Sequence, residues 1–260
     1  MKLSSVTLAA FACTALLSAT TSFAQDSAAA PSAPIKNVVL VHGLFADGSS
    51  WQKVIPLLQA KGLHVTSVQN PTTSLDADVD AVKRALAEQD GPTLLVAHSY
   101  GGMVISQAGD DPKVAGLVYV AARAPDAGED YPALTKKFPS APASAGLQWS
   151  TVGYGKLSEQ AFVKDFAGDL PTAEAETFYA VQQPIGKAIT MAKTTIAAWR
   201  DKPTWYAVST DDRTINPDLE RFMANRMHAH TIELKSSHVS LLSHPTEVAA
   251  LILEATGEQK

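Results

Sequence analysis

Short apolar runs alternate with amphipathic helical patterns from Ile35 to Arg123, and the alternation resumes after Pro203. Such runs have the length of buried strands, and strands separated by helices pair in parallel, because each helix carries the chain back to the starting edge of the sheet. The pattern predicts an α/β protein whose mostly parallel central sheet has helices on both faces. Predicted strands cover residues 35–41, 64–68, 93–97, 114–120, 204–209 and 231–234; predicted helices begin near 49 and 100 and cover 75–86, 217–227 and 246–255.

The segment from Arg123 to Lys202 interrupts this alternation. It is rich in Ala, Pro and Ser at first and helical afterwards. We interpret it as a helical cap, about residues 123–202, inserted into a single domain of residues 35–260. It should lie over the strand ends and select the substrate, with Trp149, Phe178 and Trp199 as candidate pocket residues.

Composition narrows the function classes. Of the 260 residues, 46% are hydrophobic and 18% are charged, which is enough to bury one sizeable core. The formal net charge is -5 and no basic run could follow a phosphate backbone, so nucleic acid is not an expected partner. Cys13 is the only cysteine, which excludes a disulfide framework and a cysteine-based metal site.

Residues 1–24 have the pattern of a secretory signal peptide: Lys2, an apolar stretch from Val6 to Leu17, and the small-x-small sequence Ser22-Phe23-Ala24. Residues 25–34, rich in Ala, Ser and Pro, predict a linker. We expect cleavage after Ala24, export to the periplasm or the medium, and no membrane attachment of the mature protein. A buried helix, or a lipid anchor on Cys13, fits this short stretch less well.

The strongest chemical signal is a buried strand that runs into Ala97-His98-Ser99-Tyr100-Gly101 and then into a helix. So tight a reversal strains the backbone of the serine, and small residues two positions to either side let strand and helix approach each other. Ala97 takes the place usually held by glycine and is small enough for it. The pattern predicts Ser99 as a nucleophile; the alternative is a glycine-rich turn whose serine only caps the helix.

A nucleophilic serine needs a base to take its proton and a carboxylate to orient that base. Asp211 and Asp212 both follow the strand that ends at Ser209, and either could be the acid. His238 lies between the last strand and the last helix, from where its ring could reach Ser99. Less suited histidines are His228, His230 and His244, whose surroundings also lack the further ligands of a metal site. We therefore expect neither a metal nor a cofactor.

Two backbone N–H groups would stabilise the oxyanion that forms during acyl transfer. One should belong to Tyr100, directly after the nucleophile, and the other to the loop after the first strand. That loop reads His42-Gly43-Leu44-Phe45. We expect Leu44 to be the second donor, with Phe45 as the alternative.

Together these motifs resemble the α/β-hydrolase superfamily over residues 35–255. Within it, the segments Ser209–Phe222 and Lys235–His238 are similar to the plant methyl-esterase and hydroxynitrile-lyase branch. In that branch the acid is the second of the paired acidic positions, so the resemblance implies Asp212.

The same resemblance implies ester hydrolysis rather than cyanohydrin cleavage. The lyases carry a lysine after the catalytic histidine, a threonine after the first-strand histidine and a glutamate before the serine. This chain has Val239, Gly43 and His98 at those positions.

The expected function is that of a serine hydrolase (a serine esterase) that cleaves carboxylic esters of small to medium apolar substrates. Its expected partner is a small-molecule ester, and the sequence predicts no oligomeric state. A lactonase or a cofactor-free perhydrolase (haloperoxidase) could use the same triad. The alternative from another class is a hydrolase-fold protein that only binds a ligand, because fold does not fix function.

Overall fold

The computed structural model describes residues 34–257. The predicted signal peptide, and all of the predicted linker but its last residue, lie outside the described residues. No helix within residues 34–257 is long and apolar enough to cross a membrane.

A six-stranded sheet with the order β2-β1-β3-β4-β8-β9 forms the centre of the fold, and every neighbouring pair in it is parallel. This sheet confirms the predicted α/β class. Every residue of β1 and β3 is buried, because helices cover both faces. The strands are β1 Asn37–Val41, β2 His64–Val68, β3 Thr93–His98, β4 Val114–Val120, β8 Thr204–Ser209 and β9 His230–Leu234.

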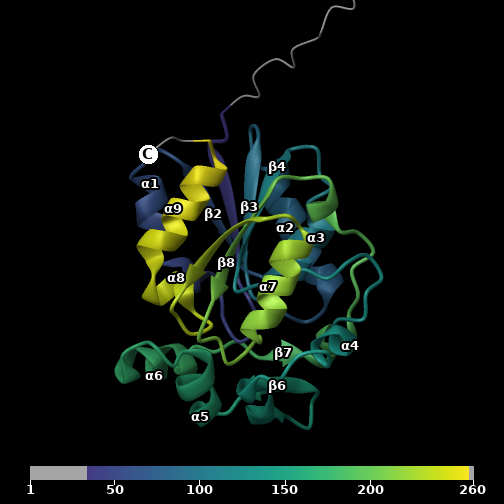
Figure 1. Ribbon diagram of the computed structural model, residues 1–260, viewed down its shortest axis with the longest axis vertical. Coiled ribbons are helices and arrows are strands. Elements are labelled where there is room, and N and C mark those ends of the chain that lie inside the picture. Colours follow the sequence, from purple (N-terminus) through teal and green to yellow (C-terminus); the bar gives the residue numbers. More distant parts are fainter. Residues whose placement is uncertain (1–33, 258–260) are drawn as a thin grey trace, which may run out of the picture. The chain divides into compact units, whose positions relative to one another are not determined.

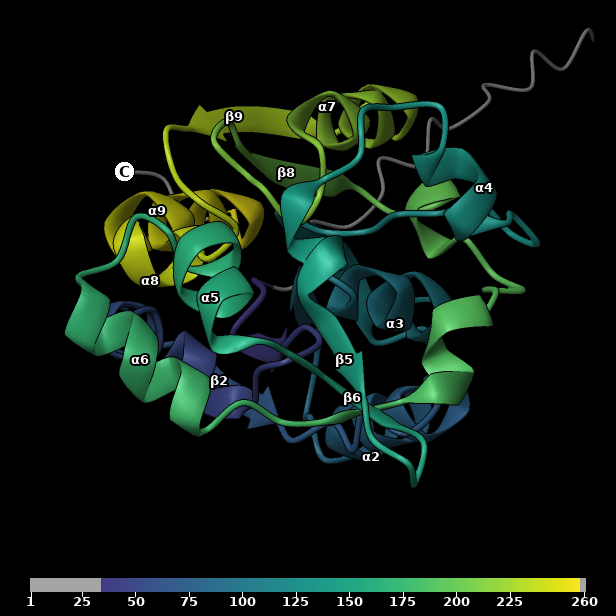
Figure 2. The same ribbon diagram turned by 90° about the horizontal axis from the view of Figure 1, so that it is seen from below.

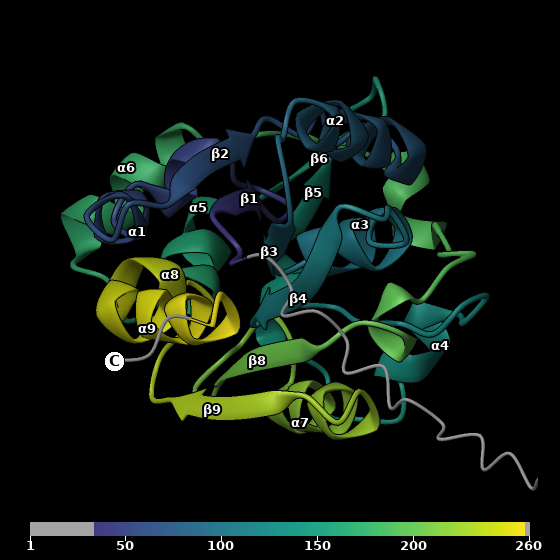
Figure 3. The same ribbon diagram turned by 90° about the horizontal axis from the view of Figure 1, so that it is seen from above.

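Helices pack on the two faces of this sheet, with α1, α8 and α9 on one face and α2, α3 and α7 on the other (Figure 3). Their apolar residues face the strands, as the spacing of Leu75, Val79, Val82 and Leu86 along α2 illustrates. The helices are α1 Ile55–Gln59, α2 Leu75–Ala87, α3 Gly101–Ala108, α7 Pro217–Arg226, α8 Ser240–Ser243 and α9 Pro245–Ala255.

The helix predicted to begin near Ser49 is divided in two. A 3₁₀ helix, Gly48–Trp51, begins at Asp47, whose side chain accepts a hydrogen bond from the Ser49 N–H. The helix α1 begins only at Ile55, with Pro56 in its first turn. Because proline has no N–H to donate to the preceding turn, it permits the start of a helix but not its continuation through that point.

Residues 142–191 of the insertion lie at the carboxyl ends of the central strands, below the sheet in Figure 1 and in front of it in Figure 2. Its last residues, 198–202, run back beside α3 to the start of β8. The insertion is not wholly helical, because it also contains a three-stranded antiparallel sheet. These strands are only two to four residues long, too short to give a periodic signal in the sequence. Its elements are α4 Tyr131–Thr135, β5 Leu147–Trp149, β6 Tyr154–Leu157, α5 Glu159–Ala161, α6 Thr172–Ala180, β7 Ile185–Gly186, the 3₁₀ helices Pro142–Gly146, Lys187–Met191 and Ala198–Arg200, and the π-helix Phe162–Phe166.

Candidate active site

Ser99 lies in the tight turn between β3 and α3, with a φ of 55°. Few residues other than glycine adopt this left-handed conformation, and it costs free energy that the surrounding packing must offset. The close approach of helix and strand explains Gly101: a Cβ at this position would lie 2.8 Å from the carbonyl oxygens of Val41 and His42. The local sequence therefore forces the serine into a strained, fixed position at the end of β3.

The structure brings Ser99, His238 and Asp212 together in one hydrogen-bonded chain. The Nε2 atom of His238 lies 2.8 Å from the Ser99 hydroxyl oxygen, and its Nδ1 atom lies 2.5 Å from an Asp212 carboxylate oxygen. All three side chains are buried, which strengthens each polar contact relative to the same contact in water. Because Nδ1–H donates to the carboxylate, Nε2 is left to accept the serine proton.

Of the two adjacent aspartates, only Asp212 reaches the histidine. Its second carboxylate oxygen accepts hydrogen bonds from the N–H groups of Thr214 and Ile215, at 2.6 and 2.9 Å. Asp211 is exposed, and its side chain makes no hydrogen bond to any residue the structure describes. The turn after β8 thus points one carboxylate inward, holds it by backbone donors, and leaves the other in solvent.

The loop after β1 packs directly against Ser99. A Cβ on Gly43 would lie 2.6 Å from the Ser99 Cβ, so only glycine fits between the two. The N–H groups of Leu44, Phe45 and Tyr100 make no hydrogen bond within residues 34–257. These N–H groups beside Ser99 are available to an oxyanion, and the geometry leaves the choice between Leu44 and Phe45 open.

Two buried histidines that sequence reasoning gave no structural role support this arrangement. The Nε2–H of His98 donates to the carbonyl oxygen of His238 at 2.9 Å. This hydrogen bond links the end of β3 to the loop that contains His238. His42 accepts from the Asn70 N–H and donates to the Gly43 carbonyl, each at 2.9 Å, and so holds the loop after β1. Burial lowers the pKa of both rings, so both remain neutral.

Glu220 lies buried beside Asp212, and no motif in the sequence marks it. Its carboxyl accepts a hydrogen bond from the Ser209 N–H at 3.1 Å. Burial, and then the negative charge of Asp212, raise the pKa of Glu220 well above its usual value. Burial therefore disfavours a negative charge on Glu220, next to the Asp212 carboxylate that contacts His238.

Asp78 holds the side chain of Tyr100, the residue that follows Ser99. The Tyr100 hydroxyl donates to one oxygen of Asp78 at 2.9 Å, and the Thr72 N–H donates to the other at 2.8 Å. Burial raises the pKa of Asp78 to about 6, because two hydrogen bonds compensate only in part for the loss of hydration. On α2 this aspartate looks like an ordinary first-turn residue, so no sequence signal marks it.

Replacing Asp78 with asparagine should make the protein's stability less sensitive to pH. The pKa is raised from 3.8 to about 6, so between these pH values the folded state binds more protons than the unfolded chain. The contribution of Asp78 to the free energy of unfolding therefore falls as pH rises through this window, by roughly 2–3 kcal/mol in all. Asparagine does not titrate, so the melting temperature of Asp78→Asn minus that of the wild type should increase from pH 4 to pH 7. A difference that stays constant would contradict this account.

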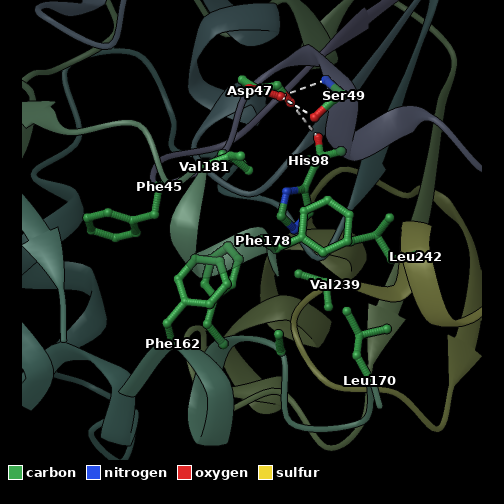
Figure 4. A pocket seen from close by; sticks show the side chains of 14 residues that line it. Phe45, Asp47, Ser49, His98, Phe162, Leu170, Phe178, Val181, Val239 and Leu242 are labelled. Carbon is green, nitrogen blue, oxygen red and sulfur yellow. Dashed lines mark hydrogen bonds between the residues drawn. The ribbon is translucent and has the colours of Figure 1, made fainter. Parts of the chain in front are cut away.

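An apolar cavity is lined by the chain neighbours of Ser99 and His238 and by residues of the insertion (Figure 4). Its walls include Phe162, Phe166 and Phe178 of the insertion and His98 and Val239 of the core. The open space is about 20 Å³, roughly one water molecule, so an apolar substrate group can enter only if side chains move. Phe45 lines this cavity and also a second one of about 250 Å³, on the side of Leu44.

The expectation that three insertion aromatics line the pocket is correct only for Phe178. Trp199 is buried elsewhere, where its indole N–H donates to the Pro125 carbonyl. Trp149 is 40% exposed and lines neither cavity. An aromatic residue in an insertion can pack against the insertion itself, and sequence spacing does not distinguish the two cases.

Residues of the insertion also contact His238 and its neighbour Ser237. The centre of the Phe166 ring lies 5.0 Å from the centre of the His238 ring, and the two rings meet edge to face. Asp169 accepts a hydrogen bond from the Ser237 N–H at 2.9 Å and another from the Ser237 hydroxyl. The insertion therefore positions the loop that carries His238, in addition to lining the apolar cavity.

No group of three or more potential metal ligands occurs within residues 34–257. His228, His230 and His244 lie outside the hydrogen-bonded chain, and His230 instead pairs with Glu254 at the surface.

Comparisons with known proteins agree with this geometry. Residues 38–251 match the model of the alpha/beta hydrolase family. The chain is 26% identical to salicylic acid-binding protein 2 of Nicotiana tabacum, over 84% of this chain and 96% of that protein. It is 28% identical to methylesterase 7 of Arabidopsis thaliana, over 84% and 95%. The crystal structure of a pyrethroid hydrolase from Sphingobium faniae is similar, with a TM-score of 0.71 and 23% identity over 86% of this chain and 98% of that one.

Proposed function

The chain belongs to the alpha/beta hydrolase family, in its methylesterase branch, and we propose that it is a serine hydrolase that cleaves carboxylic esters of small to medium apolar substrates. The observation that carries the proposal is the buried hydrogen-bonded chain from Ser99 through His238 to Asp212. Serine, imidazole and carboxylate in this order are the groups that nucleophilic acyl transfer requires. Similar proteins named as methylesterases and as a pyrethroid hydrolase support the same reaction class.

In the first half of the proposed reaction, the Ser99 oxygen attacks the ester carbonyl carbon and its proton passes to Nε2 of His238. The negative charge of Asp212 stabilises the imidazolium that results. The N–H groups of Tyr100 and Leu44 donate to the oxygen that becomes an anion. When the tetrahedral intermediate collapses, the carbon–oxygen bond to the alcohol breaks, His238 protonates the alcohol, and an acyl group remains on Ser99.

In the second half, water takes the place of the alcohol. His238 accepts a proton from the water as its oxygen attacks the acyl carbon, and the same two N–H groups stabilise the second oxyanion. Collapse releases the carboxylic acid and returns the proton to the oxygen of Ser99. The neutral His98 adds no charge that would compete with the ion pair of His238 and Asp212.

A panel of 4-nitrophenyl and methyl esters tests this function, with γ- and δ-lactones and a peracid assay as parallel arms. We expect hydrolysis of short-chain esters at rates that far exceed those with lactones or with acetate and hydrogen peroxide. Folded protein that turns over no ester would contradict the proposal. Preferred turnover of lactones, or halogenation with peroxide, would show that the same three residues catalyse a different reaction.

Truncation of Phe178 should change which esters the enzyme prefers. Phe178→Ala enlarges the small apolar cavity, so kcat/KM for longer acyl or alcohol chains should rise relative to that for 4-nitrophenyl acetate, by about 10- to 200-fold. Trp149→Ala is the matched control, because it removes an aromatic side chain of the same insertion that lines neither cavity. An equal change in both variants, or equal losses on every ester after Phe178→Ala, would show that this cavity does not set selectivity.

A further inference from the structure

Arg123 follows β4 and is the one partly buried arginine without an ion pair among residues 34–257. Its Nε atom is fully buried and has no hydrogen-bond partner, and its guanidinium lies 5.1 Å from the ring centre of Tyr131. Other arginines of the chain are paired with carboxylates: Arg200 with Asp126, Arg213 with Asp165, Arg221 with Asp218 and Glu233, and Arg226 with Glu129. Because burying a guanidinium N–H without an acceptor is costly, the Nε–H of Arg123 needs an explanation.

A second unpartnered donor lies beside it. Tyr131 is only 5% exposed, yet its hydroxyl makes no hydrogen bond within the described part of the chain. Burial raises the pKa of this phenol, so it keeps its proton and acts as a donor. Buried hydroxyls are nearly always paired, and two adjacent donors without acceptors indicate that an acceptor comes from outside the protein.

Both side chains face two adjoining cavities of about 250 and 240 Å³. The cavities share five lining residues, Arg123, Tyr131, Thr135, Ser144 and Thr214. Neither cavity is lined by an aspartate or glutamate, although the protein has more acidic than basic residues. Lys136 adds a second positive charge to the smaller one. The walls around Arg123 thus carry positive charge and hydroxyl groups, and the nearest carboxylates, those of Glu220, Asp212 and Glu129, lie behind Tyr131 and outside both linings.

This space adjoins the nucleophile. The Arg123 N–H donates to the Ser99 carbonyl oxygen at 2.9 Å, so the backbone of Arg123 is fixed to the turn that holds the serine. Leu44 and Phe45, from the loop after β1, also line the larger cavity. A group held by Arg123 would therefore belong to the same molecule whose carbonyl lies at Ser99.

We propose that Arg123 and Tyr131 bind a carboxylate that the ester substrate carries in addition to its scissile bond. A planar guanidinium matches a carboxylate through two parallel N–H···O bonds, and the Tyr131 hydroxyl supplies a third donor. The preferred substrates are then half esters of dicarboxylic acids. The apolar cavity beside His98 takes the uncharged end of the substrate. This inference rests on the proposed esterase function and specifies its substrate class.

The test compares charged and neutral esters of equal length. The 4-nitrophenyl half esters of succinate, glutarate and adipate are each paired with the ester of the unbranched monocarboxylic acid with the same number of carbons. Arg123→Met keeps the apolar stem of the side chain and removes the donors. It should lower the ratio of kcat/KM for the charged ester to that for its neutral partner by about 10- to 100-fold, at the chain length that fits best.

Two further variants separate recognition from a packing role. Tyr131→Phe keeps the ring beneath the guanidinium and should lower the same ratio by about 3- to 10-fold. Arg84→Met removes an exposed arginine on α2 that lines neither cavity, and should leave the ratio unchanged. If the ratio stays within twofold of the wild type at all three chain lengths in both Arg123→Met and Tyr131→Phe, the proposal is wrong while the esterase function stands.

Binding without turnover keeps the two proposals distinguishable. Glutarate is titrated calorimetrically into Ser99→Ala and into the double variant Ser99→Ala/Arg123→Met. The dissociation constant should rise by about 10-fold or more when Arg123 is removed. This result would support the carboxylate site even if no ester were hydrolysed. Equal affinity in the two proteins would overturn it.

Discussion

Ser99→Ala and His238→Ala should each lower kcat/KM for 4-nitrophenyl acetate by on the order of 10³-fold or more, without loss of folding. In the proposed mechanism the hydroxyl is the nucleophile and the ring moves its proton, so neither group works alone. The double variant should be no slower than either single variant, because members of one catalytic unit are not additive. Initial rates at saturating and at low ester concentration, with circular dichroism as the check on folding, provide the measurement.

Two results would contradict this prediction. Losses that multiply in the double variant would mean that Ser99 and His238 act in separate steps, despite the 2.8 Å between their reacting atoms. A folded Ser99→Ala protein with nearly wild-type turnover would identify a different nucleophile.

Asp212→Asn should lower kcat/KM by roughly 10³- to 10⁴-fold, close to the effect of removing the histidine. Asparagine has nearly the same shape, but it lacks the negative charge and can turn its NH₂ group toward His238. The ring is then held in the wrong tautomer, with Nε2 protonated and unable to accept from Ser99. The hydrogen bonds from Thr214 and Ile215 can be kept by the amide oxygen, so the turn should survive.

Asp211→Asn is the matched control for this prediction. It makes the same chemical change one residue earlier, in an exposed side chain without hydrogen bonds in the described structure, and its rate should stay within about threefold of the wild type. A larger loss from Asp211→Asn than from Asp212→Asn would show that the buried carboxylate is not the orienting group.

The alternation of apolar runs and helical patterns predicted the central sheet well. The strands β2, β4 and β8 have the predicted bounds, and the others differ by one or two residues. Strands buried on both faces consist of continuous apolar residues, so their signal is strong. The small sheet of the insertion has no such signal, because its strands are short and each pair of them is joined over only two or three residues.

The sequence carries a signal for a site residue where backbone geometry dictates the residue type. A strained strand-to-helix turn requires small neighbours, and this requirement marks Ser99 in the sequence. The choice of Asp212 over Asp211 needed the family resemblance, because both follow the same strand. Asp78, Glu220 and Arg123 could not be found in this way, since their properties depend on burial and on partners distant in the chain.

Covalent labelling with a fluorophosphonate, followed by intact mass and peptide mapping, can identify the nucleophile itself. Such a reagent phosphonylates a serine only where a base takes its proton and donors hold the developing charge. We expect one adduct per chain, located on Ser99. The adduct should form at the wild-type rate in Asp211→Asn and much more slowly in Asp212→Asn. It should not form in Ser99→Ala. An adduct on another residue, or undiminished labelling of Ser99→Ala, would contradict this account.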